Sequence, residues 1–86
     1  NESPTGFLNA LKDGQADALE PFVLCVMSEL RRRARSLLLN ERSGHTLQPT
    51  GLVNEAFVRL FNGKPVPWAH SSEFFASASR EMRHIL

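Results

Sequence analysis

The chain has 86 residues, of which 42% are hydrophobic and 22% charged, with a formal net charge of +1, and this balance predicts one small globular domain. A domain of this size buries only about 60–65% of its unfolded surface, which argues against a large enclosed active-site cavity. The longest apolar run, residues 22–27, is far shorter than the about 20 residues that span a bilayer, and the single Cys25 without a disulfide partner fits a reducing, cytoplasmic setting.

The first predicted element is a short helix over about residues 4–13. Ser3 can cap its N-terminus, Pro4 suits the first helical position, and Gly14 can end the helix in a left-handed conformation. Three further segments show helical periodicity, and none shows the strict alternation of a half-buried strand. The pattern therefore predicts an all-α fold, a compact bundle of about four helices.

The second predicted helix covers about residues 16–40, with Pro21 in its first turn. Arg33 interrupts the apolar side, so either its stem lies along the apolar surface or this end of the helix faces a partner. Cys25 lies in the apolar run and is predicted to be a packed, inert thiol. The predicted buried stripe recurs at three- and four-residue steps: Leu19, Phe22, Val23, Val26, Met27, Leu30, Ala34, Leu37 and Leu38.

The charges are concentrated in this second helix. Residues 1–28 carry a net charge of −3, whereas residues 29–42 carry +3 because five arginines there face two glutamates. A basic block in a neutral domain can bind a polyanion or an acidic protein surface, although such a block is more often a solvated helix face. The sequence leaves open whether the cluster from Arg31 to Arg35 contacts a partner or only water.

The third predicted helix begins at Pro49 or Thr50, runs to about residue 62 and is ended by Gly63. Glu55 and Arg59 are spaced for an i,i+4 pair worth about 0.3–0.5 kcal/mol, which is a sufficient structural reason for both. Val58 is an apolar side chain on the polar face. The residues of the predicted core face share one arc of the helix: Leu52, Val53, Ala56, Phe57, Leu60 and Phe61.

A loop over residues 63–70 follows, and its glycine and two prolines exclude regular structure. The fourth predicted helix begins at Ser71 or Ser72 and continues to the last residue. Its predicted outer side carries Arg80, Arg83 and His84. Its predicted inner face consists of Phe74, Phe75, Ala78, Met82, Ile85 and Leu86.

Catalytic and metal-binding patterns are absent from the sequence. There is no phosphate-binding glycine loop, no nucleophile elbow and no H-E-x-x-H motif. The three histidines, His45, His70 and His84, have no metal-ligand spacing. We therefore expect no enzyme activity, no cofactor and no metal.

Residues 45–60 read HTLQPTGLVNEAFVRL. This segment resembles a signature of bacterial extracytoplasmic-function (ECF) sigma factors, and it is most similar to the ECF-like subgroup, which reads H-T-L-Q-P-T-A-L-V-x-E-A-[YF]-L-R-L. Residues 29–35 and 74–86 agree with the same family in order and spacing, so the resemblance covers nearly the whole chain. It departs at Gly51, Arg33, Glu81 and His84, where the family more often has Ala, an apolar residue, a small residue and Arg.

The resemblance implies that residues 1–86 form region 2 of a sigma-70-family initiation factor, the N-terminal piece of a longer sigma factor without region 4. Such a domain docks on the coiled coil of the polymerase β′ clamp, and it captures and helps melt the promoter −10 element. The implied partners are core RNA polymerase, the non-template strand of promoter DNA and an anti-sigma factor, with no membrane. The chemistry belongs to the polymerase, so no catalytic residue is implied.

The family's functional positions carry over to two sets of residues. The polymerase-binding set lies on the outer side of the third helix: Thr50, Asn54, Glu55, Val58 and Arg59. The DNA-binding set lies in the loop over about residues 62–72, which would hold an unstacked base, and on the fourth helix: Lys64, Trp68, His70, Ser71, Ser72, Arg80, Arg83 and His84.

Structural alternatives to these roles remain open. Trp68 could close the top of the core, and Arg80 and Arg83 could be ordinary solvated residues. The main functional alternative is a helical protein-interaction domain with the sigma fold but without promoter binding. A helix-turn-helix reader of duplex DNA is disfavoured, because the loop over residues 63–70 is too long and too rich in proline for its turn.

Overall fold

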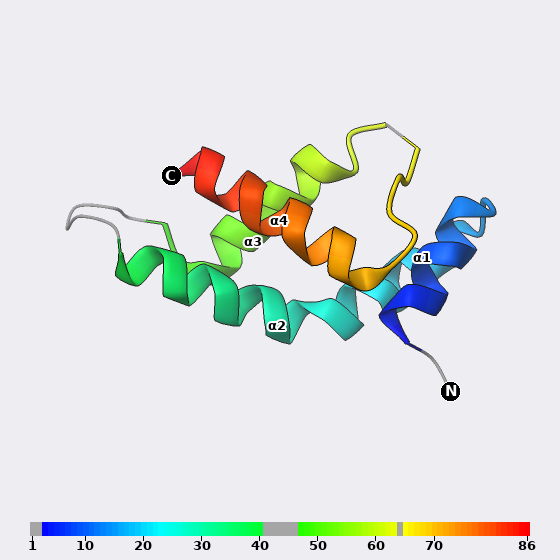
Figure 1. Ribbon diagram of the computed structural model, residues 1–86, viewed down its shortest axis with the longest axis horizontal. Coiled ribbons are helices and arrows are strands. Elements are labelled where there is room, and N and C mark those ends of the chain that lie inside the picture. Colours follow the sequence, from blue (N-terminus) through cyan, green and yellow to red (C-terminus); the bar gives the residue numbers. More distant parts are fainter. Residues whose placement is uncertain (1–2, 41–46, 64) are drawn as a thin grey trace.

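The computed structural model describes residues 3–40, 47–63 and 65–86. The elements are α1 (Pro4–Lys12), a 3₁₀ turn η1 (Ala16–Ala18), α2 (Leu19–Leu39), α3 (Pro49–Leu60) and α4 (Ser71–Ile85). Within these ranges there is no strand, so the prediction of an all-α bundle of four helices is confirmed. Figure 1 shows α2, the longest helix, running beneath α3 and α4, with α1 at one end of the bundle.

The ends of α1 follow the predicted capping residues. The Ser3 hydroxyl oxygen accepts a hydrogen bond from the Gly6 backbone N–H at 3.2 Å, and Pro4 occupies the first helical position. Gly14 has φ +86°, a conformation that glycine adopts without a Cβ penalty. This turn reverses the chain and allows Leu8, which is fully buried, to face the start of α2.

The second helix begins later than predicted. Residues 16–18 form a 3₁₀ turn and α2 itself begins at Leu19. Pro21 explains the difference, because it has no N–H to donate to the carbonyl of Asp17 and its ring crowds that carbonyl. The segment before Leu19 is therefore held by tighter i→i+3 bonding, with the Ala18 N–H donating to the Gln15 carbonyl at 3.0 Å.

Two predictions about the buried face of α2 are wrong. Leu19 is 41% exposed, and Cys25 is exposed instead of packed. The helical period accounts for Cys25: Phe22 and Val26 lie one turn apart on the inner face, so Leu24 and Cys25 point outward, and Leu24 is 73% exposed. An unbroken apolar run on a helix cannot be buried on all sides by a single neighbouring layer.

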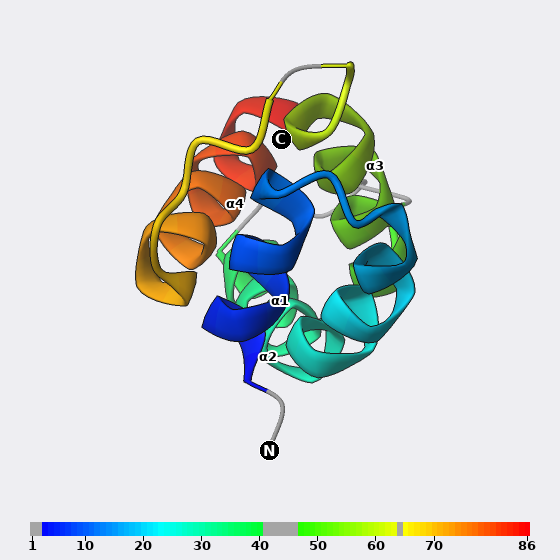
Figure 2. The ribbon, with the colours of Figure 1, turned by 90° about the vertical axis from the view of Figure 1, so that its right-hand side faces the viewer.

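The core is centred on the fully buried ring of Phe74 from α4. Its centroid lies 4.8 Å from that of Phe22 and 5.2 Å from that of Trp68, both in edge-to-face geometry, and 6.1 and 6.2 Å from those of Phe57 and Phe61. This aromatic cluster joins α2, α3 and α4 and the loop before α4. Figure 2 shows α1 lying across one end of these three helices.

No helix in the ranges 3–40, 47–63 and 65–86 is long and apolar enough to cross a bilayer. The inner faces predicted for α3 and α4 are confirmed. Leu52, Val53 and Ala56 are buried in α3, and Ala78 and Met82 are buried beside Phe74 in α4. Burial of these faces decides which side chains of the two helices remain on the surface.

Candidate protein and nucleic-acid interfaces

The outer face of α3 is a continuous exposed surface, formed by Thr50, Asn54, Glu55, Val58 and Arg59. Pro49 begins the helix, and the buried side of α3 packs against α2 and α4, so this opposite side faces away from the bundle. Val58 is 66% exposed although it is a large apolar residue. The structure therefore gathers all five residues of the predicted polymerase-binding set on one surface.

The charges on this face are only loosely paired. Arg59 Nε lies 3.9 Å from Glu55 Oε2, which confirms the i,i+4 pair, and Arg59 Nη1 lies 3.9 Å from Glu81 Oε1 of α4. Both distances are at the limit of an ion pair, and the side chains of Arg59 and Glu55 are about half exposed while that of Glu81 is 30% exposed, so each pair contributes only about 0.2–1 kcal/mol. Glu55 is therefore available to a positively charged partner.

Trp68 lies in the core, which is the structural alternative to DNA binding that the sequence left open. Trp68 is only 6% exposed, and its indole Nε1–H donates a hydrogen bond to Ser77 Oγ at 2.9 Å. The ring packs edge to face on Phe61 and Phe74. In this arrangement Trp68 has no exposed ring face on which a base could stack. Its ring instead packs within the core, against the residues around it.

The residues at the start of α4 form hydrogen bonds that stabilise this end of the helix. Glu73 Oε1 accepts hydrogen bonds from the backbone N–H groups of Ala69 at 2.8 Å and His70 at 3.3 Å, and these bonds hold the pKa of Glu73 below its usual range. The Ser71 N–H donates to Thr5 Oγ1 of α1 at 3.1 Å. His70 and Ser72 keep exposed side chains, while Lys64 lies outside the described residues.

An open pocket of about 220 Å³ lies between α3 and α4, below the loop that joins them. Its lining combines apolar and charged residues. We call it the α3–α4 pocket, and its lining residues are Arg59, Leu60, Pro65, Pro67, Trp68, Ser77, Arg80 and Glu81. The structure thus brings Trp68 and Arg80 of the predicted DNA-binding set together with Arg59 of the predicted polymerase-binding set.

The three basic residues predicted on the outer side of α4 are spaced as neighbours on the helix, at i,i+3 and i,i+4, but they do not line the same cavity. Arg80 lines the α3–α4 pocket, whereas Arg83 lines a groove on the other side of α4, between α4 and α2. His84 is exposed and lines neither. His70, Ser71 and Ser72 lie about 12–15 Å from Arg80 along the helix axis, because each helical residue advances about 1.5 Å.

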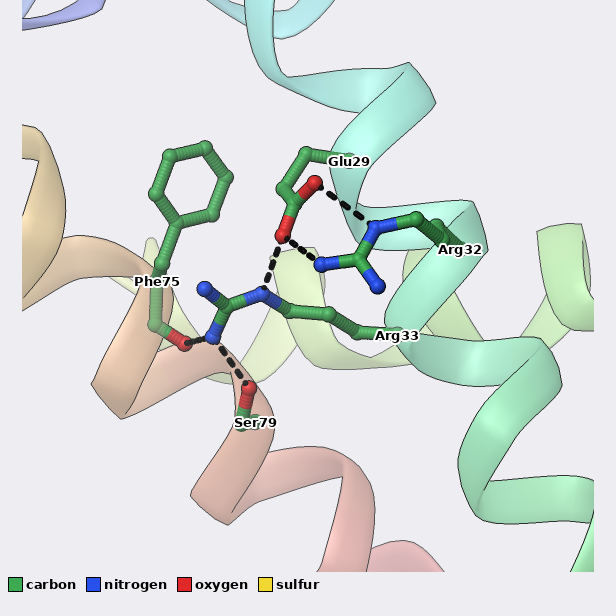
Figure 3. Close-up of polar contacts among 5 residues, drawn as sticks. All are labelled: Glu29, Arg32, Arg33, Phe75 and Ser79. Carbon is green, nitrogen blue, oxygen red and sulfur yellow. Dashed lines mark hydrogen bonds and ion pairs between the residues drawn. The ribbon is translucent and has the colours of Figure 1, made fainter.

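Arg33, the residue that interrupts the apolar stripe of α2, is explained by its contacts with α4. Its Nη1 donates to Ser79 Oγ at 3.0 Å and to the Phe75 carbonyl at 3.4 Å, and its guanidinium carbon lies 5.0 Å from the centroid of the Phe75 ring. Its Nε donates to Glu29 Oε2 at 2.8 Å. Figure 3 shows the side chain reaching from α2 to α4 between these groups. Arg33 therefore links the two helices.

Glu29 connects two arginines of the basic block. Its carboxylate accepts two hydrogen bonds from Arg32, at 2.6 and 3.0 Å, besides the bond from Arg33. These bonds, with that from Arg32 the strongest cause, lower the pKa of Glu29 from 4.5 to about 2. Glu29 is therefore ionised at any neutral or mildly acidic pH, and it orients both guanidinium groups.

Sequence reasoning missed Ser77 and Glu81 in the α3–α4 pocket and Ser36 and Ser79 in the α2–α4 groove. The only sequence signal for Glu81 was its departure from the small residue of the ECF pattern, and Ser79 had none. Among the described residues, no group of three or more His, Cys, Asp or Glu side chains could hold a metal ion.

A comparison with protein-family models matches the family described as ECF sigma factor over residues 1–86. No curated protein and no solved structure matches the chain. The family match agrees with the resemblance of residues 45–60 and with the four-helix fold.

Proposed function

The chain belongs to the ECF sigma factor family, whose role is transcription initiation, and we propose from this membership that it is a region 2 domain that binds core RNA polymerase and the promoter −10 element. It would act in the cytoplasm, without a cofactor and without catalysis of its own, and an anti-sigma factor would be a further partner. The observation that carries the proposal is the exposed outer face of α3, within the segment that resembles the family most closely.

The outer face of α3 suits a docking surface for the β′ clamp. It presents Val58, an apolar side chain with 66% exposure, one turn after Glu55, which pairs with Arg59. An exposed apolar residue flanked by charges is the usual composition of an interface centre with a polar rim. The clamp of the family's polymerase offers basic side chains, so the Glu55 carboxylate would be its electrostatic complement.

A charge reversal tests this docking surface. Glu55→Arg should weaken binding to core RNA polymerase by at least about 100-fold, because juxtaposed like charges cost several kcal/mol. Glu20→Arg is the matched control, since Glu20 is also exposed but lies in the first turn of α2. Equal affinities of the two variants, both shown to be folded by circular dichroism, would remove Glu55 from the interface.

The α3–α4 pocket is the candidate site for an unstacked base of the −10 element. Leu60 and the two prolines provide apolar contact for a base, and Ser77, Arg80 and Glu81 provide hydrogen-bonding groups at its edge. Arg80 can also neutralise the adjoining phosphate. Trp68 supports this pocket from the core and would not stack on the base.

Arg80 provides the test of DNA binding. Arg80→Ala should remove about one phosphate contact with labelled, mixed-sequence single-stranded DNA. The slope of log K against log salt should therefore decrease in magnitude by about 0.7–1. Arg35→Ala is the control, because Arg35 is exposed on α2 and lines neither site on α4. Polymerase binding without any DNA binding would favour the protein-interaction alternative.

A further inference from the structure

We propose that the groove between α2 and α4 is a second phosphate-binding site, which holds the backbone of the DNA strand whose base enters the α3–α4 pocket. This inference rests on the proposed function and extends it to Arg32, Arg33 and Ser79, which the family resemblance left unassigned, beside Arg83, which the resemblance assigned to DNA binding. The α2–α4 groove has a volume of about 240 Å³, and its lining residues are Arg32, Arg33, Ser36, Leu37, Ser79 and Arg83.

The lining of the groove has the composition of an anion site. Three guanidinium groups and two hydroxyl groups converge on it from two helices, and one leucine forms its apolar wall. Arginine side chains present planar arrays of N–H donors that match phosphate oxygens, and serine hydroxyls add neutral donors. Among the described residues, Glu29 pairs with Arg32 and Arg33 and no carboxylate pairs with Arg83, so the three arginines and Glu29 together carry a net charge of +2.

Glu29 orients this cluster without using all of its donors. Arg32 directs Nε and Nη2 to the carboxylate, and Arg33 directs Nε to it and Nη1 to Ser79. Figure 3 shows one terminal nitrogen of each guanidinium outside these bonds. These nitrogens, Nη1 of Arg32 and Nη2 of Arg33, have no partner among the residues that the structure describes, and neither does the guanidinium of Arg83. A phosphate can therefore be bound without breaking the existing pairs.

The position of the groove connects it to the α3–α4 pocket. The two sites lie on opposite sides of α4, with Ser77 and Arg80 on one and Ser79 and Arg83 on the other. A helix with its side chains is about 10–12 Å across, so one short stretch of DNA that crosses α4 can reach both. Phosphate contacts of this kind fix the register of a strand, while the base contact supplies sequence preference.

The arginines of the basic block, residues 29–42, differ in whether they line the groove. Arg32 and Arg33 line it, whereas Arg35 of the same helix is exposed and does not. The pairs of Glu29 with Arg32 and Arg33 have ordinary i,i+3 and i,i+4 spacing, but a solvated helix face would not account for the hydrogen bond from Arg33 to Ser79 of α4. Arg32, Arg83 and Arg35 therefore provide two test positions and a matched control.

The test is the salt dependence of binding between the full chain and a labelled, mixed-sequence single-stranded DNA, followed by fluorescence anisotropy. Arg32→Ala and Arg83→Ala should each lower the slope of log K against log salt by about 0.7, the value for one phosphate contact to a single strand. Arg35→Ala should leave the slope unchanged. Glu29→Gln, which removes the only carboxylate of the cluster, should raise the affinity at low salt.

Different results would overturn different parts of the proposal. Unchanged slopes for Arg32→Ala and Arg83→Ala, together with a lower slope for Arg80→Ala, would reject the groove and leave the proposed function intact. A wild-type chain that binds polymerase but no DNA would reject both DNA sites and retain the clamp surface. Tighter binding of poly-glutamate than of DNA, lost in Arg32→Ala, would assign the groove to an acidic protein segment and reject the phosphate site.

Discussion

The two sides of α4 differ in the kind of ligand that their chemistry can hold. The α3–α4 pocket combines apolar walls with both signs of charge, Arg59 and Arg80 beside Glu81. The α2–α4 groove instead presents three arginines and two hydroxyl groups around one leucine. The first suits the flat, partly apolar body of a base with donors and acceptors at its edge. The second suits an anion.

This difference follows from how one helix, α4, is oriented in the core. Phe74, Ala78 and Met82 are buried and fix which direction of α4 faces inward. The residues flanking that inner face are then assigned to α3 on one side and to α2 on the other. Changes to the inner face should disturb both sites, whereas changes to a flank should disturb only one.

The largest effect is expected from Phe74→Ala, which should disturb the α3–α4 pocket and the α2–α4 groove together. Phe74 is fully buried and contacts the rings of Phe22 and Trp68, and loss of such a side chain costs about 3–5 kcal/mol. A domain of this length has a total stability of about 4–13 kcal/mol, so this variant can be largely unfolded. Urea denaturation measures the loss.

Two companion variants make that measurement interpretable. Phe74→Leu keeps an apolar side chain and should be less destabilised, while Ala76→Ser changes an exposed position of the same helix by at most about 0.5 kcal/mol. Similar stability of Phe74→Ala and Ala76→Ser would mean that the aromatic cluster is not the centre of the core.

A smaller effect, confined to the pocket side, is expected from Ser77→Ala. The substitution leaves the buried Trp68 Nε1–H without its partner, which costs about 1–3 kcal/mol. Ser72→Ala is the control, because Ser72 is exposed in the first turn of α4. If thermal melts of the two variants coincide, the indole hydrogen bond does not support the pocket.

The smallest effect concerns the groove side and depends on pH. Because the folded-state pKa of Glu29 is about 2, below its ordinary value of 4.5, its contribution to stability is present above pH 4.5 and is lost as the pH falls toward 2. The stability advantage of the wild type over Glu29→Gln should shrink across this range, measured by denaturation at a series of pH values. A constant difference would contradict the pairing with Arg32 and Arg33.

Much of the fold was predictable from local patterns. Ser3, Pro4 and Gly14 mark the ends of α1, and the apolar arcs of α3 and α4 identify their buried faces, because the helical period links spacing along the chain to direction in space. The same rule exposes Val58, so the outer face of α3 was predictable too. The burial of Cys25 was predicted wrongly because composition of the run was given more weight than its period.

The contents of the two sites on α4 could not be predicted in the same way. Arg33 and Ser79 are 46 positions apart in the sequence, and no local spacing rule relates them. Trp68 could equally have faced a ligand or the core, and only the ring positions of Phe61 and Phe74 decided between these. Contacts of this kind depend on how whole helices pack.

By itself, then, the sequence determined the four helices, their inner faces and the outer face of α3, because periodicity and capping act over a few residues. The tertiary structure alone decided that Arg80 and Arg83 belong to different sites, that Trp68 supports one of them, and that Glu29 holds two arginines toward the other. The physical reason is that the angle and rotation of α4 against α2 and α3 are set by burial of the shared core, which brings together residues that are distant in the chain.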